Sequence, residues 1–111
     1  MTGKYKVVTL CGSTKFKEDF IKAQELLTLR GYIVISVGLF VHADNKYQKE
    51  ITPSIKMMLD DIHKRKIDMS DGIFVINKDD YIGESTLSEI QYAKDTGKSI
   101  DYMYPHAENK K

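Results

Sequence analysis

Hydrophobic and polar positions follow two alternating periods along this chain, and each period predicts one kind of secondary structure. Short apolar runs rich in β-branched residues predict four buried strands, at residues 6–11, 32–37, 72–77 and 99–104. Apolar residues at helical spacing between these runs predict three helices. The predicted order of elements is therefore β-α-β-α-β-α-β.

Residues typical of helix starts precede two of the helices. Ser13 is predicted to cap the first helix, and Thr52 is predicted to cap the second, which has Pro53 in its first turn. The third helix is expected from about Ser85. The helices are predicted to end at Gly31, near Met69 and at Gly97. Residues 38–52 show no clear period and predict a binding loop, a lid or a mobile segment, in which His42 is a candidate contact for a base or a phosphate.

Strands that alternate with helices predict a mostly parallel sheet covered by helices and joined by right-handed crossovers. We expect a single domain over residues 1–111, with a three-layer, doubly wound α/β fold of about four to five strands, Rossmann- or flavodoxin-like. The expected strand order is 2-1-3-4. In such a sheet, ligands bind beyond the carboxyl ends of the strands where the order reverses, between the first and third strands. This rule selects two turns, one after Cys11 and one after Asn77.

The two selected turns have similar chemistry. Gly12-Ser13-Thr14-Lys15 and Gly83-Glu84-Ser85-Thr86 each combine a glycine with hydroxyl side chains and are each predicted to open a helix. Glycine lets a ligand approach the backbone, and a helix N-terminus offers free N–H groups, so the combination favours a phosphate, a carboxylate or a sugar hydroxyl. The alternative is that Ser13, Ser85 and Thr86 only cap helices.

Glu89 also has two interpretations. Thr86-Leu87-Ser88-Glu89 fits a capping box, in which the glutamate bonds back to the first residue of the motif. Alternatively, Glu89 projects into the ligand site, where the helix N-terminus is expected to lower its pKa and keep it ionised. An ionised carboxylate aimed at a sugar C1 is the nucleophile that retaining glycosyl transfer requires.

Composition and charge exclude several classes of protein. Seventeen basic and sixteen acidic residues give a formal net charge of +1, which argues against a nucleic-acid polymer as partner. No apolar stretch approaches the roughly 20 residues of a membrane span, and the N-terminus lacks the pattern of a signal peptide, so we predict a cytoplasmic protein without a membrane partner. Cys11 is the one cysteine and is predicted to be a buried structural thiol.

Metal and redox chemistry have no signal in the sequence. The three histidines show no metal-ligand spacing with cysteine or acidic residues, so we expect neither a metal nor another cofactor. His63 is predicted to lie on the surface or to anchor a loop. The methionines Met57, Met58 and Met69 are predicted to fill the core.

Three stretches of the chain carry a family resemblance: Thr9-Leu10-Cys11-Gly12-Ser13, Asp71–Ile76 and Gly83–Ala93. They resemble the nucleoside 2-deoxyribosyltransferase-like superfamily, which includes small nucleotide N-glycosidases, and the similarity runs from Val7 to Tyr102. Glu89-Ile90-Gln91-Tyr92-Ala93 is similar to the family's Glu-Leu-Gly-Tyr-Ala, whose glutamate is the nucleophile. The resemblance implies that Glu89 is the nucleophile and that Asp71 orients or protonates the base.

The chain departs from this family at three positions. Thr9 stands where the deoxyribose-transferring enzymes have a tyrosine, Gly83 where a second aspartate is expected, and Gln91 where the motif has glycine. Asp79, Asp80, Tyr81 and Glu84 are candidates to replace the missing carboxylate or hydroxyl. Ser85-Thr86-Leu87-Ser88-Glu89 also resembles the Gly-Thr-Leu-x-Glu turn of lysine-decarboxylase-like phosphoribohydrolases, which holds a 5′-phosphate.

The predicted function is cleavage or transfer at the N-glycosidic bond of a nucleoside or nucleoside 5′-monophosphate. Glu89 and Asp71 are the predicted catalytic residues. The predicted ligand cradle consists of Gly12, Ser13, Thr14, Gly83, Ser85 and Thr86. The alternative is a nucleotide-binding or nucleotide-sensing module without catalysis. A homodimer or larger homo-oligomer is expected, with residues 102–104 in contact with a neighbouring subunit.

Overall fold

Four parallel strands form one sheet in this computed structural model, which describes residues 3–44 and 47–106. The strands are β1 (Val7–Gly12), β2 (Ile33–Ile35), β3 (Gly72–Ile76) and β4 (Ser99–Tyr102). All three pairings are parallel, and the strand order is β2-β1-β3-β4. The predicted order 2-1-3-4 is therefore confirmed, and the point where the order reverses lies between β1 and β3.

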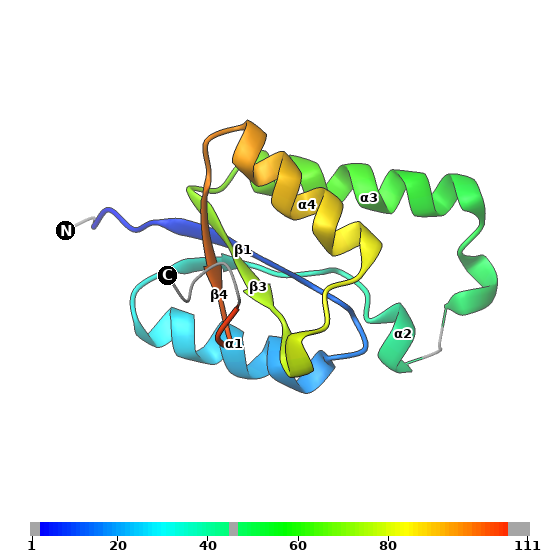
Figure 1. Cartoon of the computed structure of the whole chain (residues 1–111), viewed down its shortest axis with the longest axis horizontal. Coiled ribbons are helices and arrows are strands. Elements are labelled where there is room, and N and C mark those ends of the chain that lie inside the picture. Colours follow the sequence, from blue (N-terminus) through cyan, green and yellow to red (C-terminus); the bar gives the residue numbers. More distant parts are fainter. Residues whose placement is uncertain (1–2, 45–46, 107–111) are drawn as a thin grey trace.

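Helices cover both faces of the sheet (Figure 1). Helix α1 (Lys17–Leu29) lies on one face, and α3 (Pro53–Asp68) and α4 (Glu84–Asp95) lie side by side on the other. A short helix, α2 (Val41–Asp44), and a 3-10 turn at Gln48–Glu50 lie in the connection from β2 to α3. The three-layer, Rossmann-like α/β fold predicted from the sequence is confirmed.

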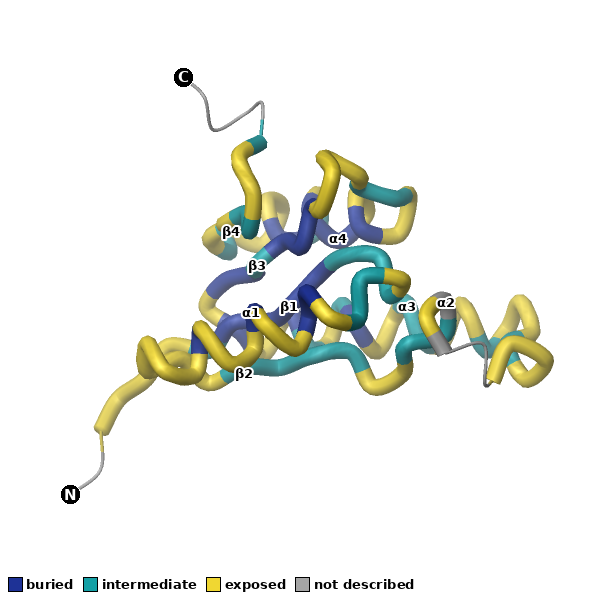
Figure 2. The backbone as a smooth tube through the Cα atoms, turned by 90° about the horizontal axis from the view of Figure 1, so that it is seen from below, coloured by how far each residue is buried: buried dark blue, intermediate teal, exposed yellow. Residues whose placement is uncertain are grey.

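The sheet has one apolar core on each face, visible in Figure 2 as the buried backbone of the central strands. The α1 side buries Val8, Leu10, Phe20, Ala23, Leu27 and Ile76. The opposite side buries Cys11, Ile67, Ile73, Val75, Ile90 and Ala93. Successive side chains of a strand point to opposite faces, so Leu10 packs toward α1 whereas Cys11 faces the layer of α3 and α4. This alternation directs Cys11 toward the helices that carry the site described below.

Several helix boundaries follow the predicted signals, and others do not. Thr52 caps α3 by accepting a hydrogen bond from the N–H of Ile55 at 3.2 Å, with Pro53 in the first turn. Gly31 follows α1 with a φ of +89°. In contrast, α1 begins only at Lys17, so the prediction that Ser13 caps it is wrong.

The methionines predicted to fill the core are exposed instead. Met57, Met58 and Met69 keep 73%, 48% and 70% of their surface accessible. Helix α3 packs only a narrow face against the sheet and α4, with Ile67 and His63 as its buried residues. The apolar spacing along α3 therefore overstated how much of this helix is buried.

Residues 102–104, predicted to contact a neighbouring subunit, have partners within the chain. Met103 packs against the α1-side core, and the Tyr104 hydroxyl donates to Asp19 Oδ2 at 3.0 Å. Among the helices described, none combines the length and the apolar character that crossing a membrane requires.

Candidate functional site

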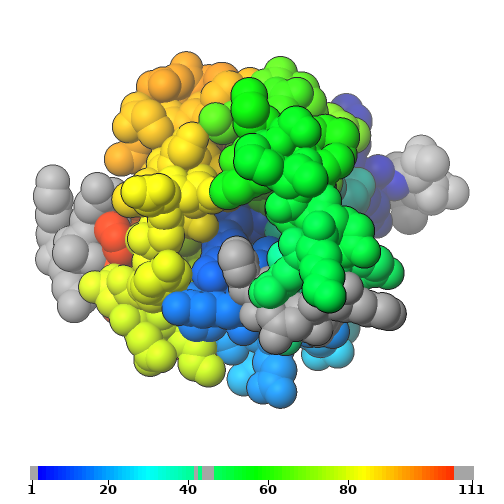
Figure 3. Space-filling model, turned by 90° about the vertical axis from the view of Figure 1, so that its right-hand side faces the viewer, coloured from blue at the N-terminus to red at the C-terminus, as the bar shows by residue number. Residues whose placement is uncertain are grey.

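A cavity of about 610 Å³ lies at the carboxyl edge of the sheet. It is bordered by the turn after β1, the segment after β2, helix α3 and the first turns of α4. Figure 3 shows it as a hollow between α3 in green and the start of α4 in yellow, with the end of β1 and its turn in blue at the bottom. This is the place where the strand order predicts a ligand site, and the volume suits a small molecule.

The turn after β1 lines this cavity, as predicted, through Gly12, Ser13 and Thr14. Gly12 has a φ of +154°, and a Cβ at this position would lie 2.8 Å from the Ile76 carbonyl oxygen. Only glycine therefore allows β1 to end this close to β3. Ser13 Oγ accepts a weak hydrogen bond from the N–H of Lys15 at 3.4 Å within the turn. Because α1 starts four residues after Ser13, this turn does not place a helix N-terminus at the ligand site.

The turn before α4 also lines the cavity, through Gly83, Glu84, Ser85 and Thr86. Helix α4 begins at Glu84 with Gly83 as its N-cap, and none of the described side chains caps it. Its first backbone N–H groups therefore remain for a ligand. The Lys56 ammonium from α3 donates to Ser85 Oγ at 3.2 Å, which adds a positive charge beside this turn. The chemistry here suits an anion.

Glu89 lines the cavity and is buried, with 8% of its surface exposed. The capping-box interpretation is wrong, because α4 begins at Glu84 and Glu89 therefore lies in the second turn. Burial raises the pKa of Glu89 from 4.5 to about 7, and a hydrogen bond with the Cys11 thiol opposes this rise. The expectation that the helix N-terminus lowers its pKa is therefore wrong: removal from water dominates.

His63 is part of the site, contrary to the prediction of a surface position. It lies on α3, is 7% exposed and lines the same cavity. Burial and the nearby Lys66 ammonium lower its pKa from 6.5 to about 4, so the imidazole is neutral at pH 7. One sequence signal could have identified it: His63 is four residues from both Leu59 and Ile67, which places it on the inner face of the helix.

Cys11 is a fully buried thiol, as predicted, but it belongs to a polar cluster rather than to the apolar core alone. Its Sγ lies 3.5 Å from His63 Nε2, and the same nitrogen lies 3.8 Å from Glu89 Oε1. Burial, together with the Glu89 carboxylate, raises the pKa of the Cys11 thiol well above its ordinary value. The thiol is therefore protonated at neutral pH and is not a poised nucleophile.

Asp71, predicted to orient or protonate the base, does not line the cavity. It precedes β3 and therefore lies at the amino edge of the sheet, whereas the cavity lies at the carboxyl edge. Asp71 Oδ2 accepts a hydrogen bond from the N–H of Val7 at 2.8 Å, and its own N–H donates to the Val7 carbonyl at 2.8 Å. These bonds give Asp71 a structural role between β1 and β3.

Of Asp79, Asp80, Tyr81 and Glu84, the candidates for an additional carboxylate or hydroxyl, Tyr81 and Glu84 line the cavity. Lys15 places its ammonium 3.7 Å from the centre of the Tyr81 ring. Thr9 is buried outside the cavity, and its hydroxyl bonds to Ser70 and to the Lys66 carbonyl. The side chain of His42 lies outside the described part of the structure.

The chain matches no protein-family model and no curated protein.

Proposed function

We propose that this protein cleaves or transfers at the N-glycosidic bond of a nucleoside or nucleoside 5′-monophosphate, with Glu89 as the nucleophile. The observation that carries the proposal is a buried carboxylate on the wall of a cavity at the switch point of a parallel sheet. Both glycine- and serine-containing turns line this cavity.

The lining of the cavity combines apolar and polar groups, as a nucleotide site requires. Its apolar residues suit contact with a base and are Val37, Leu39, Val41, Ile51, Leu59 and Ile62. Its polar groups include the Lys56 ammonium, the Ser85 hydroxyl and the start of α4, which suit a phosphate or sugar hydroxyls. Glu89 also lines the cavity, from the second turn of α4.

In the proposed reaction, an ionised Glu89 oxygen attacks C1′ of the sugar. The bond from C1′ to the base nitrogen breaks, and the base leaves with the bonding electron pair and takes up a proton. The resulting glycosyl ester is then opened by water or by a second base, which frees the carboxylate. The pKa of Glu89 is raised to about 7, so both the protonated form and the reactive, ionised form are populated near neutral pH.

The test is incubation of the full chain with a panel of nucleosides and 5′-monophosphates, with chromatographic detection of the free base. Wild type is expected to release base from at least one substrate, and Glu89→Gln is not. Asp95→Asn, which removes a carboxylate from the same helix outside the cavity, serves as the matched control and should retain activity. Ligand binding by wild type and Glu89→Gln alike, with no base released by either, would favour a nucleotide-binding module instead.

A further inference from the structure

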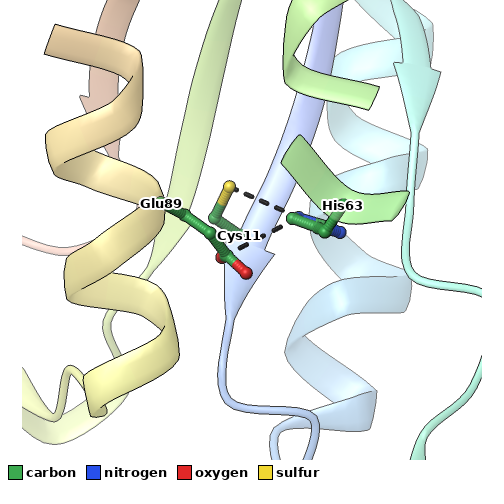
Figure 4. A group of neighbouring side chains, drawn as sticks. All are labelled: Cys11, His63 and Glu89. Atoms are coloured by element: carbon green, nitrogen blue, oxygen red, sulfur yellow. Dashed lines mark hydrogen bonds and ion pairs between the residues drawn. The ribbon is translucent and has the colours of Figure 1, made fainter. Parts of the chain in front are cut away.

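Three side chains from three separate elements converge beside the cavity: Cys11 from β1, His63 from α3 and Glu89 from α4 (Figure 4). Their thiol, imidazole and carboxylate ligand atoms all lie within 4.8 Å of one another, and all three residues are buried. The residues are 52 and 26 positions apart along the chain, so no local motif brings them together.

The contacts do not form a relay of the kind found in catalytic triads. In a triad, one nitrogen of the imidazole faces the nucleophile and the other faces the carboxylate. Here His63 Nε2 faces both Cys11 Sγ, at 3.5 Å, and Glu89 Oε1, at 3.8 Å. One ring nitrogen carries either one proton or one lone pair, so it cannot serve both neighbours equally as a hydrogen-bond partner. The Cys11 thiol also hydrogen-bonds with the Glu89 carboxylate, and a cation between the three ligand atoms replaces that bond with a bond to each of them.

The spacing fits a tetrahedral zinc-type ion. With metal bonds of about 2.3 Å to sulfur and about 2.0 Å to nitrogen and oxygen, a tetrahedral site separates sulfur from nitrogen by about 3.5 Å and nitrogen from oxygen by about 3.3 Å. The observed sulfur–nitrogen distance is 3.5 Å. The nitrogen–oxygen distance of 3.8 Å is slightly longer, and a small shift of the Glu89 carboxylate closes it.

We propose that Cys11, His63 and Glu89 bind a divalent transition-metal ion of the zinc class. Thiolate, imidazole and carboxylate are the ligands that Zn²⁺ takes in proteins. On binding, the Cys11 thiol releases its proton to solvent, and so does the Glu89 carboxyl where it is protonated. The resulting thiolate and carboxylate together neutralise the two positive charges of the ion. His63 and Glu89 line the cavity, so the fourth position of the metal is open to it, as in zinc sites with three protein ligands.

The two lysines that line the cavity are engaged with other partners. Lys56 pairs with Asp60 at 3.1 Å and donates to Ser85. Lys66 donates to the Ser36 carbonyl at 2.9 Å. Both ammonium groups are therefore bonded to oxygen atoms outside the three-residue cluster, although Lys66 is near enough to His63 to lower the pKa of the imidazole. Asp60 adds a negative charge to the same cavity.

A consequence follows if the proposed function also holds. A carboxylate bound to a metal ion cannot attack a sugar, so Zn²⁺ at this site would inhibit base release. This consequence rests on the proposed function, whereas metal binding itself does not.

The test of metal binding is a Co²⁺ titration of the full chain after treatment with a chelator, followed by absorption spectroscopy. Wild type is expected to bind one equivalent and to show a sulfur-to-cobalt charge-transfer band, which reports on Cys11 because the chain has one cysteine. Zn²⁺ should displace Co²⁺ and remove the band, because zinc binds more tightly to such ligands. Cys11→Ser should lose the band.

The remaining ligands are tested with His63→Gln and Glu89→Gln, each of which should weaken Co²⁺ binding by roughly a hundredfold. Asp95→Asn is the matched control and should bind as wild type does. Circular dichroism verifies that each variant is folded. The proposal is overturned if folded wild type shows no thiolate band, or if the band and affinity are unchanged in folded His63→Gln and Glu89→Gln.

The two proposals fail separately. A cobalt–thiolate band without base release from any substrate would support the metal site and contradict the proposed function. Base release without a cobalt–thiolate band would support the proposed function and contradict the metal site. If both proposals hold, Cys11→Ser should need at least about tenfold more Zn²⁺ than wild type for half inhibition of its own activity.

Discussion

Glu89 and Asp71 lie at opposite edges of the same sheet, and their carboxylates have different surroundings. Asp71 is exposed at the amino edge, where its side chain and its backbone N–H both bond to Val7. Glu89 is buried at the carboxyl edge, where it faces a cavity, a thiol and an imidazole. Among the described residues, no backbone hydrogen bond to the Glu89 carboxylate accompanies these contacts.

The difference separates a structural carboxylate from a functional one. An exposed carboxylate that accepts a backbone hydrogen bond stabilises the fold. A buried ionisable group destabilises the fold when it is charged, and such groups are concentrated where proteins bind ligands or carry out chemistry. Substitutions at these two positions should therefore have opposite effects on activity and stability.

The largest expected effect is on base release. Glu89→Gln should lower kcat by roughly a thousandfold, because the amide oxygen is a poor nucleophile. Asp71→Asn should retain kcat within about twofold, because Asp71 lies outside the cavity. Steady-state kinetics on the best substrate of the panel measures both. Comparable falls in kcat for the two variants would contradict the assignment of a catalytic role to Glu89 and a structural role to Asp71.

The pH dependence of activity should follow the ionisation of Glu89. The nucleophile must be ionised, and its pKa is raised to about 7. The value of kcat/KM should therefore rise about tenfold per pH unit below this pKa and level off above it. Asp71→Asn should leave the profile unchanged. A rate that increases as the pH falls would instead make Glu89 a general acid.

Glu89 and His63 should change the free energy of unfolding in opposite directions as the pH changes. The pKa of Glu89 is 4.5 when unfolded and about 7 when folded, so the folded state holds the proton more tightly and its stability falls as the pH rises through this window. The pKa of His63 is 6.5 when unfolded and about 4 when folded, so its contribution falls as the pH decreases through that window. Where the windows overlap, the two effects cancel in wild type.

Urea unfolding of wild type, Glu89→Gln and His63→Gln across this range measures each effect. Relative to wild type, Glu89→Gln should gain on the order of 1 kcal/mol of unfolding free energy per unit rise in pH, and His63→Gln should gain a similar amount per unit fall. Asp95→Asn should follow the wild-type curve. Parallel curves for all four proteins would show that neither buried group changes its proton affinity on folding.

The positive charge beside the start of α4 should distinguish nucleotides from nucleosides. Lys56→Ala removes the ammonium that bonds to Ser85, so affinity for a 5′-monophosphate should fall about tenfold, whereas affinity for the nucleoside changes little. Isothermal titration calorimetry with both ligands measures this. Lys64→Ala, on the same helix outside the cavity, is the matched control, and an equal loss for both ligands would contradict a phosphate site at Lys56.

The smallest expected effect is on the stability of the amino edge. Asp71→Ala removes the acceptor of the Val7 N–H, which should lower the free energy of unfolding by about 1 kcal/mol. Urea denaturation measures the loss, and Asp61→Ala, which removes an exposed ion pair with Arg65 at 3.5 Å, should cost less. A large fall in kcat for folded Asp71→Ala would contradict this structural role and indicate that Asp71 is catalytic.

The rule that ligands bind at the carboxyl ends of parallel strands identified the ligand site, and it also explains why Asp71 lies outside that site. Ligands bind after strands, at their carboxyl ends, and Asp71 comes before β3. The five residues of β3, at about 3.3 Å each, separate the two edges by roughly 16 Å. The predicted catalytic role of Asp71 rested on the family resemblance, whereas its position before β3 places it at the edge away from the cavity.

The sequence by itself determined the strand order, the switch point and the two turns that line the cavity. Hydrophobic periods, glycines and right-handed crossovers are local or topological properties, and they can be recognised without coordinates. Only the tertiary structure decided which polar groups meet. Cys11, His63 and Glu89 come from a strand and two helices whose packing determines their separation. The pKa of Glu89, which the helix N-terminus was expected to lower, is set instead by burial, a property of the packed layers rather than of any one segment.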